Sequence, residues 1–204
     1  MIRSFLKFSF LIIGALIFAY PFLWMLAGSV KPELEISDLS LWSSHTSLHS
    51  YEQVLTKIPI ARAFLNSMIV SLSTTVSVVL FGSMVGYALA KLRFFGSKLL
   101  YVLILFTMMI PFQITLIPQY ILMVKLGLTD TYASLIAPTM MSAFSIVVFR
   151  QFFMSLPQAL IDAARIDGCS EPGILFRLIW PLSRPVIVTV AILTFMASWN
   201  DVLW

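Results

Sequence analysis

Long apolar stretches separated by short polar segments dominate the pattern of hydrophobic and polar positions along the chain. A helix needs about 20 consecutive, mostly apolar residues to cross about 30 Å of hydrocarbon. Five stretches meet this requirement, at about residues 8–30, 64–90, 99–124, 132–153 and 186–204. The first is longer than the apolar core of a secretory signal peptide. The pattern therefore predicts an all-α fold, a polytopic bundle of transmembrane helices.

The amino-acid composition excludes most other classes of protein. Of the 204 residues, 60% are hydrophobic and 11% are charged, whereas a soluble domain carries about 25% charged residues. This chain is too apolar for a soluble fold or for intrinsic disorder. Cys169 has no partner for an intrachain disulfide, and no Cys and His residues have the spacing of a zinc site. We therefore expect a membrane protein without a bound metal.

The Lys and Arg residues indicate the orientation of the spans. With the N-terminus in the cytoplasm, nine cationic residues lie inside and four outside, which satisfies the positive-inside rule. Residues 31–63 then form a polar outer loop, and residues 150–184 form the longest inner loop. Because the positive charges are distributed by membrane side, the net charge of +4 does not indicate binding to nucleic acid. Residues 1–204 are expected to form one transmembrane domain in contact with lipid.

Small residues interrupt the apolar pattern of the second span. Gly82 and Gly86 are four residues apart, a spacing that lets another helix approach closely. The same span carries several Ser and Thr residues, whose hydroxyl groups mostly bond to their own or a neighbouring helix. We therefore predict a helix-packing face, with substrate lining as the alternative.

Polar residues also occur near two prolines in the third span and at the end of the fifth. Pro111 and Pro118 each remove a backbone donor and bend the helix, so this span is either a broken helix beside a translocation cavity or a plain kink. Asp201, at the end of the fifth span, either faces a hydrophilic vestibule or reaches into water. The candidate residues of a substrate pathway are Gln113, Thr115, Asn200 and Asp201.

The inner loop, residues 150–184, has the pattern of two short helices joined by a turn. Helix starts are indicated by Pro157 and Ser170, and helix ends by Asp167-Gly168 and by Pro181 and Pro185. The first helix places Leu160, Ala163 and Ala164 close together, with Asp162 and Arg165 available for ion pairs. This surface predicts a docking site for another protein. The alternative is an amphipathic loop lying on the lipid surface.

The spacing of residues in this loop resembles the coupling motif of ATP-binding-cassette (ABC) importer permeases, E-A-A-x3-G-x9-I-x-L-P. The residues at the defined positions of this motif are Asp162, Ala163, Ala164, Gly168, Leu178, Trp180 and Pro181. Three of them differ from the motif, with Asp for Glu, Leu for Ile and Trp for Leu. Other segments are similar to the maltose and multiple-sugar type permeases, in particular 109–113, 117–118, 125–128, 132–133, 149–153 and 198–201. This second resemblance extends from about residue 60 onward.

The resemblance implies a permease subunit in the bacterial inner membrane that takes up a sugar or related carbohydrate. Its expected partners are a second permease, a cytoplasmic ATPase dimer and an extracytoplasmic solute-binding protein. The loop 157–181 would couple the permease to the ATPase through Asp162, Ala163, Ala164, Arg165, Asp167, Gly168, Leu178 and Pro181. The chain contains no Gly-x4-Gly-Lys-Ser/Thr sequence, so we expect no cofactor here and ATP bound by the partner subunit.

Two features bear on the alternatives to this function. Members of the resembling family continue into a sixth span, which this chain is expected to lack because it stops at Trp204. A membrane scaffold that transports nothing is therefore one alternative. An intramembrane enzyme is another, but it needs a nucleophile with a base, or paired acids, at one depth. His45 and His49 both lie in the predicted outer loop, so we expect no enzyme activity.

Overall fold

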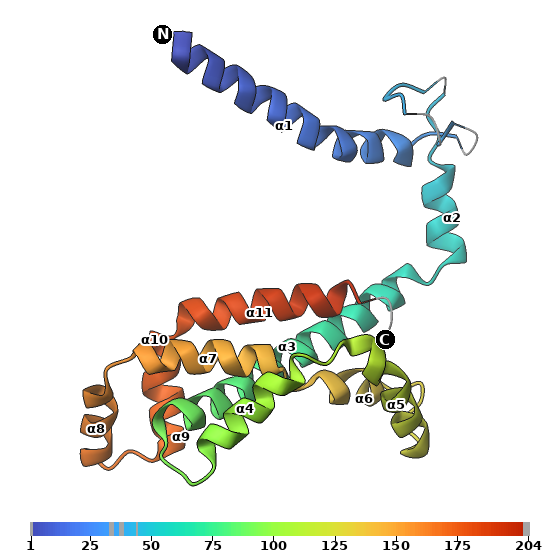
Figure 1. Ribbon diagram of the computed structural model, residues 1–204. Helices are drawn as coiled ribbons and strands as arrows, with labels where there is room; N and C mark the ends of the chain where they lie inside the picture. The colour runs from blue at the N-terminus through green and yellow to red at the C-terminus, as the bar shows by residue number, and fades with distance from the viewer. Residues whose placement is uncertain (1, 33–34, 37–38, 44, 202–204) are drawn as a thin grey trace. The chain divides into compact units, whose positions relative to one another are not determined.

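The computed structural model describes residues 2–32, 35–36, 39–43 and 45–201, and every regular element within them is helical. The chain divides into two compact units, Met1–Phe64 and Leu65–Trp204. Figure 1 shows the order of the helices along the chain. The all-α fold predicted from the sequence is confirmed. Residues 202–204, the end of the predicted fifth span, lie outside the described part.

The first unit contains a long apolar helix and a short polar one. Helix α1 (Ile2–Ser29) continues through Pro21, and α2 (His49–Lys57) is amphipathic. In the connection between them, the buried Lys31 donates from Nζ to the carbonyl oxygen of Ser40 at 2.6 Å. This bond ties the segment that follows α1 to a residue nine positions later.

The second unit holds most of α3 and all the later helices. Their bounds are α3 (Ile60–Lys91), α4 (Ser97–Thr107), α5 (Phe112–Lys125), α6 (Tyr132–Ile136), the 3₁₀ turn η2 (Ala137–Thr139), α7 (Ala143–Ser155), α8 (Gln158–Ile166), α9 (Glu171–Gly173), the π-helical η3 (Ile174–Ile179), α10 (Trp180–Leu182) and α11 (Arg184–Trp199).

Two helices are long and apolar enough to cross a membrane unbent, Lys7–Ser29 and Ile60–Lys91. Three further helix pairs qualify if each bent pair forms one span, which gives up to five spans, the number predicted from the sequence. These pairs bend by 99° between α4 and α5, by 44° between η2 and α7, and by 86° between α10 and α11. The predicted third and fourth spans are therefore bent, whereas the 86° bend lies before the predicted fifth span, which α11 occupies as one helix as far as Trp199.

The two prolines of the third span act differently. Pro111 has extended backbone and forms the N-cap of α5, so the helix breaks there. Pro118 lies inside α5, which continues to Lys125. The broken-helix interpretation holds at the first proline, whereas the second leaves the helix intact.

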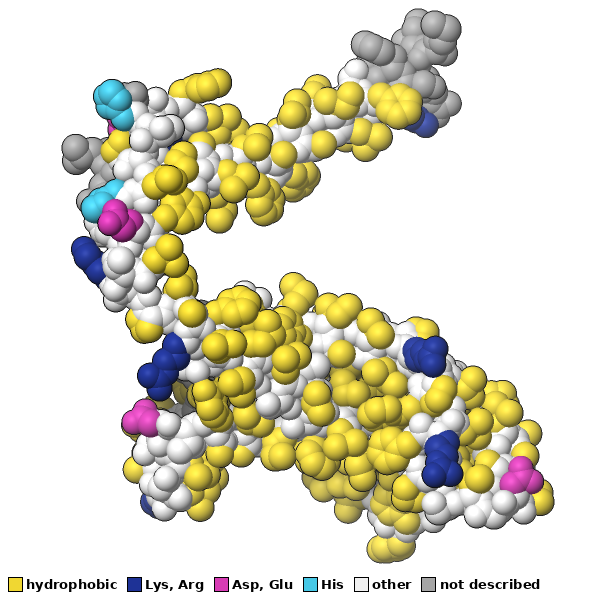
Figure 2. All heavy atoms as spheres, turned by 180° about the vertical axis from the view of Figure 1, so that it is seen from behind, with side chains coloured by type: hydrophobic (Ala, Val, Ile, Leu, Met, Phe, Trp, Pro, Cys, Tyr) yellow, Lys and Arg dark blue, Asp and Glu magenta, His cyan; other side chains and the backbone are white. Residues whose placement is uncertain are grey.

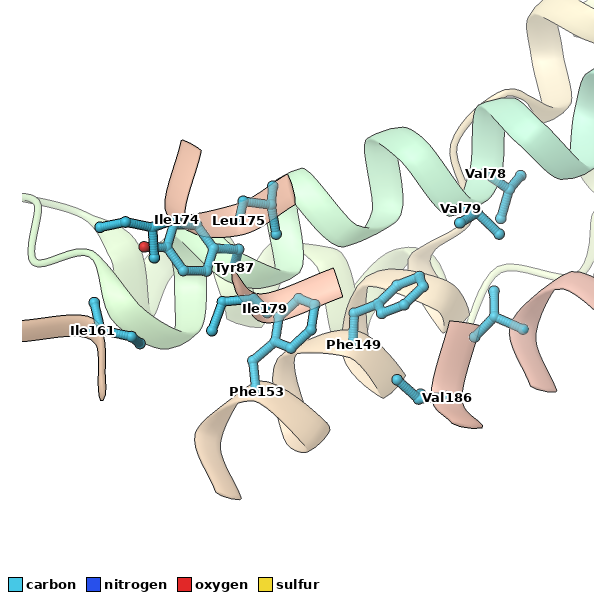
Figure 3. Packing of buried hydrophobic residues seen from close by; sticks show 11 residues of the cluster. Val78, Val79, Tyr87, Phe149, Phe153, Ile161, Ile174, Leu175, Ile179 and Val186 are labelled. Atoms are coloured by element: carbon cyan, nitrogen blue, oxygen red, sulfur yellow. The ribbon is translucent and has the colours of Figure 1, made fainter. Parts of the chain in front are cut away.

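A hydrophobic cluster holds α3 and α7 against the segment that follows α7 (Figure 3). Phe149 and Phe153 of α7 are fully buried and stack with ring centroids 5.6 Å apart. Tyr87 of α3 meets Phe153 edge to face, and Ile161 of α8 joins the same cluster. The outside of the molecule is also largely apolar (Figure 2), as expected of a surface that meets lipid or other chains.

Gly82 and Gly86 lie on the side of α3 that faces α7. A Cβ atom on Gly86 would lie 2.7 Å from the Cβ atom of Phe149 and 3.0 Å from the backbone nitrogen of Arg150. A Cβ atom on Gly82 would overlap the Oγ atom of Ser145. The four-residue spacing of the glycines thus gives α3 a face on which the backbone of α7 rests.

The segment after α7 forms the two short helices that the sequence predicts. Gly168 ends the first with φ of +79°, and Ser170 caps the second by accepting a hydrogen bond from the backbone N–H of Gly173. The second helix ends at Leu182, one residue after the predicted end at Pro181. Pro181 lies in the first turn of α10, directly after a π-helical segment, where a missing backbone donor is tolerated. Residues 150–155, the first part of the predicted inner loop, belong to α7.

Candidate functional site: a coupling loop and a polar cavity

Helix α8 carries an ion pair on its exposed side. The guanidinium of Arg165 lies 3.2 Å from Oδ1 of Asp162, three residues earlier on the same helix. Oδ1 of Asp162 also accepts a hydrogen bond of 3.1 Å from the side-chain amide of Gln158. The carboxylate that the motif places at its first position is therefore oriented by its own helix before any partner binds.

A second ion pair joins the two helices of the loop. Nε of Arg165 donates to Oε1 of Glu171 at 2.7 Å. This hydrogen bond holds the pKa of the Glu171 carboxyl below its usual value, against the opposing effect of partial burial, and it raises the pKa of Arg165. Glu171 was not among the sequence-predicted site residues. Its place in the first turn of a helix that follows an Arg-containing helix is the signal that could have identified it.

The apolar side chains of α8 point in two directions. Ile161 is fully buried and Ala164 packs against the hydrophobic cluster. Leu160, Ala163 and Ile166 are exposed, Ile166 to 87%. The small-residue surface expected from Leu160, Ala163 and Ala164 is thus divided, because Ala164 turns partly inward. Ile166, which the sequence analysis did not select, is the most exposed large apolar residue of the helix.

The remaining loop residues of the motif have different environments. Asp167 is exposed and follows the last helical residue of α8, and Gly168 forms the left-handed turn. Leu178 lies against the hydrophobic cluster, whereas Pro181 is exposed. The first half of the motif is therefore largely on the surface, and Leu178 contributes to the packing of the loop.

A cavity of about 530 Å³ lies in the second unit. Hydroxyl, amide and aromatic side chains share its wall with apolar ones. The polar and aromatic lining residues are Asn66, Ser67, Ser71, Thr74, Phe112, Gln119, Thr139, Ser142, Phe144, Thr194, Ser198, Trp199 and Asp201. The carboxylate of Asp201 is the single charged group among the described lining residues.

Of the four candidate pathway residues, Asp201 lines this cavity. The side-chain amide of Asn200 donates to the carbonyl oxygen of Met196 at 2.7 Å. The hydroxyl of Thr115 donates to the carbonyl oxygen of Phe112 at 2.9 Å. Gln113 is exposed. None of these three is among the residues that line the cavity within the described chain.

Most residues of the cavity wall are not among those predicted from the sequence. Asn66 and Thr74 of α3 and Gln119 of α5 contribute polar groups to it. The hydroxyl-rich pattern of α3 was the available signal. Thr75 and Ser77 of the same helix bond to backbone oxygens of α3, as expected of hydroxyl groups on a helix-packing face.

Comparison with known proteins identifies the family. The family "Binding-protein-dependent transport system inner membrane component" matches residues 78–204. The chain is 35% identical over 205 residues to the arabinooligosaccharides transport system permease protein AraQ of Bacillus subtilis, covering 96% of this chain and 71% of that protein. It is 30% identical over 198 residues to the lactose transport system permease protein LacG of Rhizobium radiobacter, covering 97% and 72%.

A solved structure agrees with these relatives. The crystal structure of a bacterial ABC transporter involved in the import of the acidic polysaccharide alginate superposes with a TM-score of 0.85 at 26% identity, covering 98% of this chain and 71% of that chain. The relatives are permeases of transport systems and not enzymes, which rejects the intramembrane-enzyme alternative. The chain therefore belongs to the sugar-transporter permeases among the inner-membrane components of binding-protein-dependent transport systems.

Proposed function

We propose that this chain is one of two permease subunits of an ABC importer and lines part of the pathway for a neutral saccharide. The loop 157–181 would pass the movement of a separate ATPase dimer, which binds the ATP, to the spans. A solute-binding protein would deliver the substrate on the outer side, opposite a cytoplasmic N-terminus. The observation that supports this proposal best is the pairing, in one unit, of an exposed docking helix with a polar cavity.

The outer surface of α8 has the composition of a small protein-binding site. Ile166 and Leu160 expose apolar area, and Ala163 leaves room beside them for a partner's side chains. The ion pair of Asp162 and Arg165 offers both signs of charge at the edge of this area. Apolar contacts ringed by polar groups are typical of protein interfaces. Asp162 is one methylene shorter than Glu, so the helix would seat closer to a basic group of the ATPase.

Replacing Ile166 with Asp is expected to remove the ATPase from the complex without removing the second permease. A buried apolar anchor at an interface contributes about 2 kcal/mol or more, and a charge in its place adds a desolvation cost. The measurement is co-purification from native membranes with a tag on this chain. Leu55→Asp is the matched control, because Leu55 of α2 is also exposed, to 71%, on a helix outside the coupling loop. Retention of the ATPase by Ile166→Asp would contradict the docking role.

The cavity wall favours a neutral saccharide. Hydroxyl and amide groups can bond to sugar hydroxyls, and Phe112, Phe144 and Trp199 offer apolar faces. The lining has an acid and, among the described residues, no base. An anionic sugar would therefore meet a like charge at Asp201. The relatives named for arabinooligosaccharides and lactose support this substrate class.

Asp201→Asn is expected to weaken the discrimination against acidic sugars. Removing one like charge near the substrate is worth about 1 kcal/mol or more, depending on how much water remains. The uptake ratio of an acidic to a neutral oligosaccharide should therefore rise about fivefold or more. The binding protein is the same in both assays, so its own selectivity cancels when variant and wild type are compared.

The matched control is Asp130→Asn. Asp130 is an exposed turn residue with φ of +57°, which Asn tolerates, and it does not line the cavity. An unchanged uptake ratio in Asp201→Asn would show that this carboxylate does not face the substrate.

A further inference from the structure

Three polar residues form a stripe along the last two turns of α3. Ser83, Tyr87 and Lys91 are spaced by four residues, so they lie on one side of the helix. Each makes a hydrogen bond to the segment 156–181, which includes the coupling loop 157–181. We call these three residues the polar stripe.

The three bonds reach different parts of that segment. Nε1 of Trp180 donates to Oγ of the fully buried Ser83 at 3.0 Å, near the end of the loop. The hydroxyl of Tyr87 donates to Oε2 of Glu171 at 2.5 Å, near its middle. Nζ of Lys91 donates to the carbonyl oxygen of Leu156 at 2.7 Å, where the loop begins.

The middle bond continues into the docking helix. Glu171 accepts from Tyr87 through one carboxylate oxygen and from Arg165 of α8 through the other. Arg165 in turn contacts Asp162. A continuous chain of hydrogen-bonded side chains therefore connects α3 with the exposed face of α8, and bonds to charged groups are the stronger kind.

Helix α3 also reaches the cavity. It runs for 32 residues without an internal proline. Six of its residues, the first Asn66 and the last Val78, line the cavity. Between Ser71 and Tyr87 the helix rises about 24 Å. A rigid helix thus has the loop bound at one end and the cavity at the other.

We propose that the polar stripe is the mechanical link that carries movement of the coupling loop to α3 and so to the cavity. A loop attached at one point could pivot on the helix, whereas attachment at its beginning, middle and end prevents this rotation. The contact of Gly82 and Gly86 with α7 lies beside the stripe and makes α7 move with α3. Ser83, Tyr87 and Lys91 are positioning residues in this scheme, which rests on the proposed importer function.

The test is substrate transported per ATP hydrolysed, measured on the complex purified from native membranes and reconstituted in proteoliposomes with its binding protein. Tyr87→Phe removes only the hydroxyl. It should leave ATPase binding and ATP hydrolysis in place but lower the transport per ATP about tenfold, as expected for the loss of a bond to a charged group. Glu171→Gln replaces one accepting oxygen with a donor and removes the ion pair with Arg165, so it should lower the transport per ATP at least as much. The double variant should lose less than the product of the two single effects, because both changes act on the same chain of hydrogen bonds.

Ser77→Ala is the matched control, since the hydroxyl of Ser77 on α3 bonds to the backbone oxygen of Ser73 in the same helix. It should transport as the wild type does. Ser83→Ala serves as a second test of the stripe should Tyr87→Phe fail to assemble, and it should also lower the transport per ATP.

Failure of the polar-stripe proposal and failure of the proposed importer function give different results. If Tyr87→Phe transports as much substrate per ATP as the wild type, or if hydrolysis and transport fall together at a constant ratio, the polar stripe is not the link. If the wild-type complex itself contains no ATPase or transports nothing, the proposed importer function fails instead.

Discussion

Replacing Gly86 with alanine is expected to lower the melting temperature of the protein by several degrees. The new Cβ atom would lie 2.7 Å from the Cβ atom of Phe149 and within 3.2 Å of two backbone atoms of α7. None of these atoms belongs to the flexible end of a side chain, so α3 and α7 must separate. Overpacking of this kind costs about 1–3 kcal/mol, which exceeds the gain of about 1 kcal/mol from the higher helix propensity of alanine.

Gly14 and Gly82 provide a graded comparison for this prediction. A Cβ atom on Gly14 meets nothing within 4 Å, so Gly14→Ala should be neutral or slightly stabilising. At Gly82 the nearest atom is the hydroxyl oxygen of Ser145, which can rotate away, so the destabilisation should be smaller than at Gly86. The measurement is thermal unfolding in detergent micelles. Equal melting temperatures for Gly86→Ala and Gly14→Ala would contradict the close approach of α3 and α7.

Replacing Gly168 with valine is expected to abolish uptake while the chain still inserts into the membrane. Gly168 has φ of +79°. Its backbone N–H bonds to the carbonyl oxygen of Arg165, and that of Cys169 to the carbonyl oxygen of Ala164. These two bonds form a Schellman motif, in which a left-handed residue ends the helix. A β-branched residue in this conformation costs about 2 kcal/mol or more, so the turn should rearrange and misdirect α8.

Asparagine is the informative comparison at this position, because it tolerates the left-handed conformation. Gly168→Asn should retain most of the uptake, and Gly168→Val should lose at least about tenfold, as expected for a strain above 1.4 kcal/mol. Both variants should reach the membrane in equal amounts, since Gly168 lies outside the apolar spans. Substrate-dependent uptake with normal ATPase binding in Gly168→Val would rule out an aiming role for this turn.

The sequence predicted the number and approximate place of the apolar segments, because lipid crossing depends on length and hydropathy. It predicted a bend at the prolines of the third span, but not which of the two prolines breaks the helix. Pro111 breaks its helix and Pro118 does not, although both lie in the same apolar segment. Whether a proline breaks a helix depends on which neighbours satisfy the freed backbone groups, and this is a property of the packed structure.

In the candidate site, too, local features could be predicted from the sequence, whereas features that depend on packing could not. Caps and turns are local, so Ser170 and Gly168 could be assigned from their neighbours in the sequence. The cavity and the polar stripe depend on contacts between distant residues, such as Trp180 with Ser83, which are 97 positions apart. A pattern in one segment cannot specify such a partner. Gln113 was therefore selected for its place near a proline, whereas the cavity is lined by Gln119.

The 99° bend between α4 and α5 has a consequence for hydration. The backbone N–H groups in the first turn of a helix have no partners within it, and at Pro111 such a turn interrupts an otherwise continuous apolar segment. Lipid cannot bond to these groups. Water or another protein chain must therefore reach the bend, and the amides of Phe112 and Gln113 should exchange with deuterium far faster than those in the middle of α3.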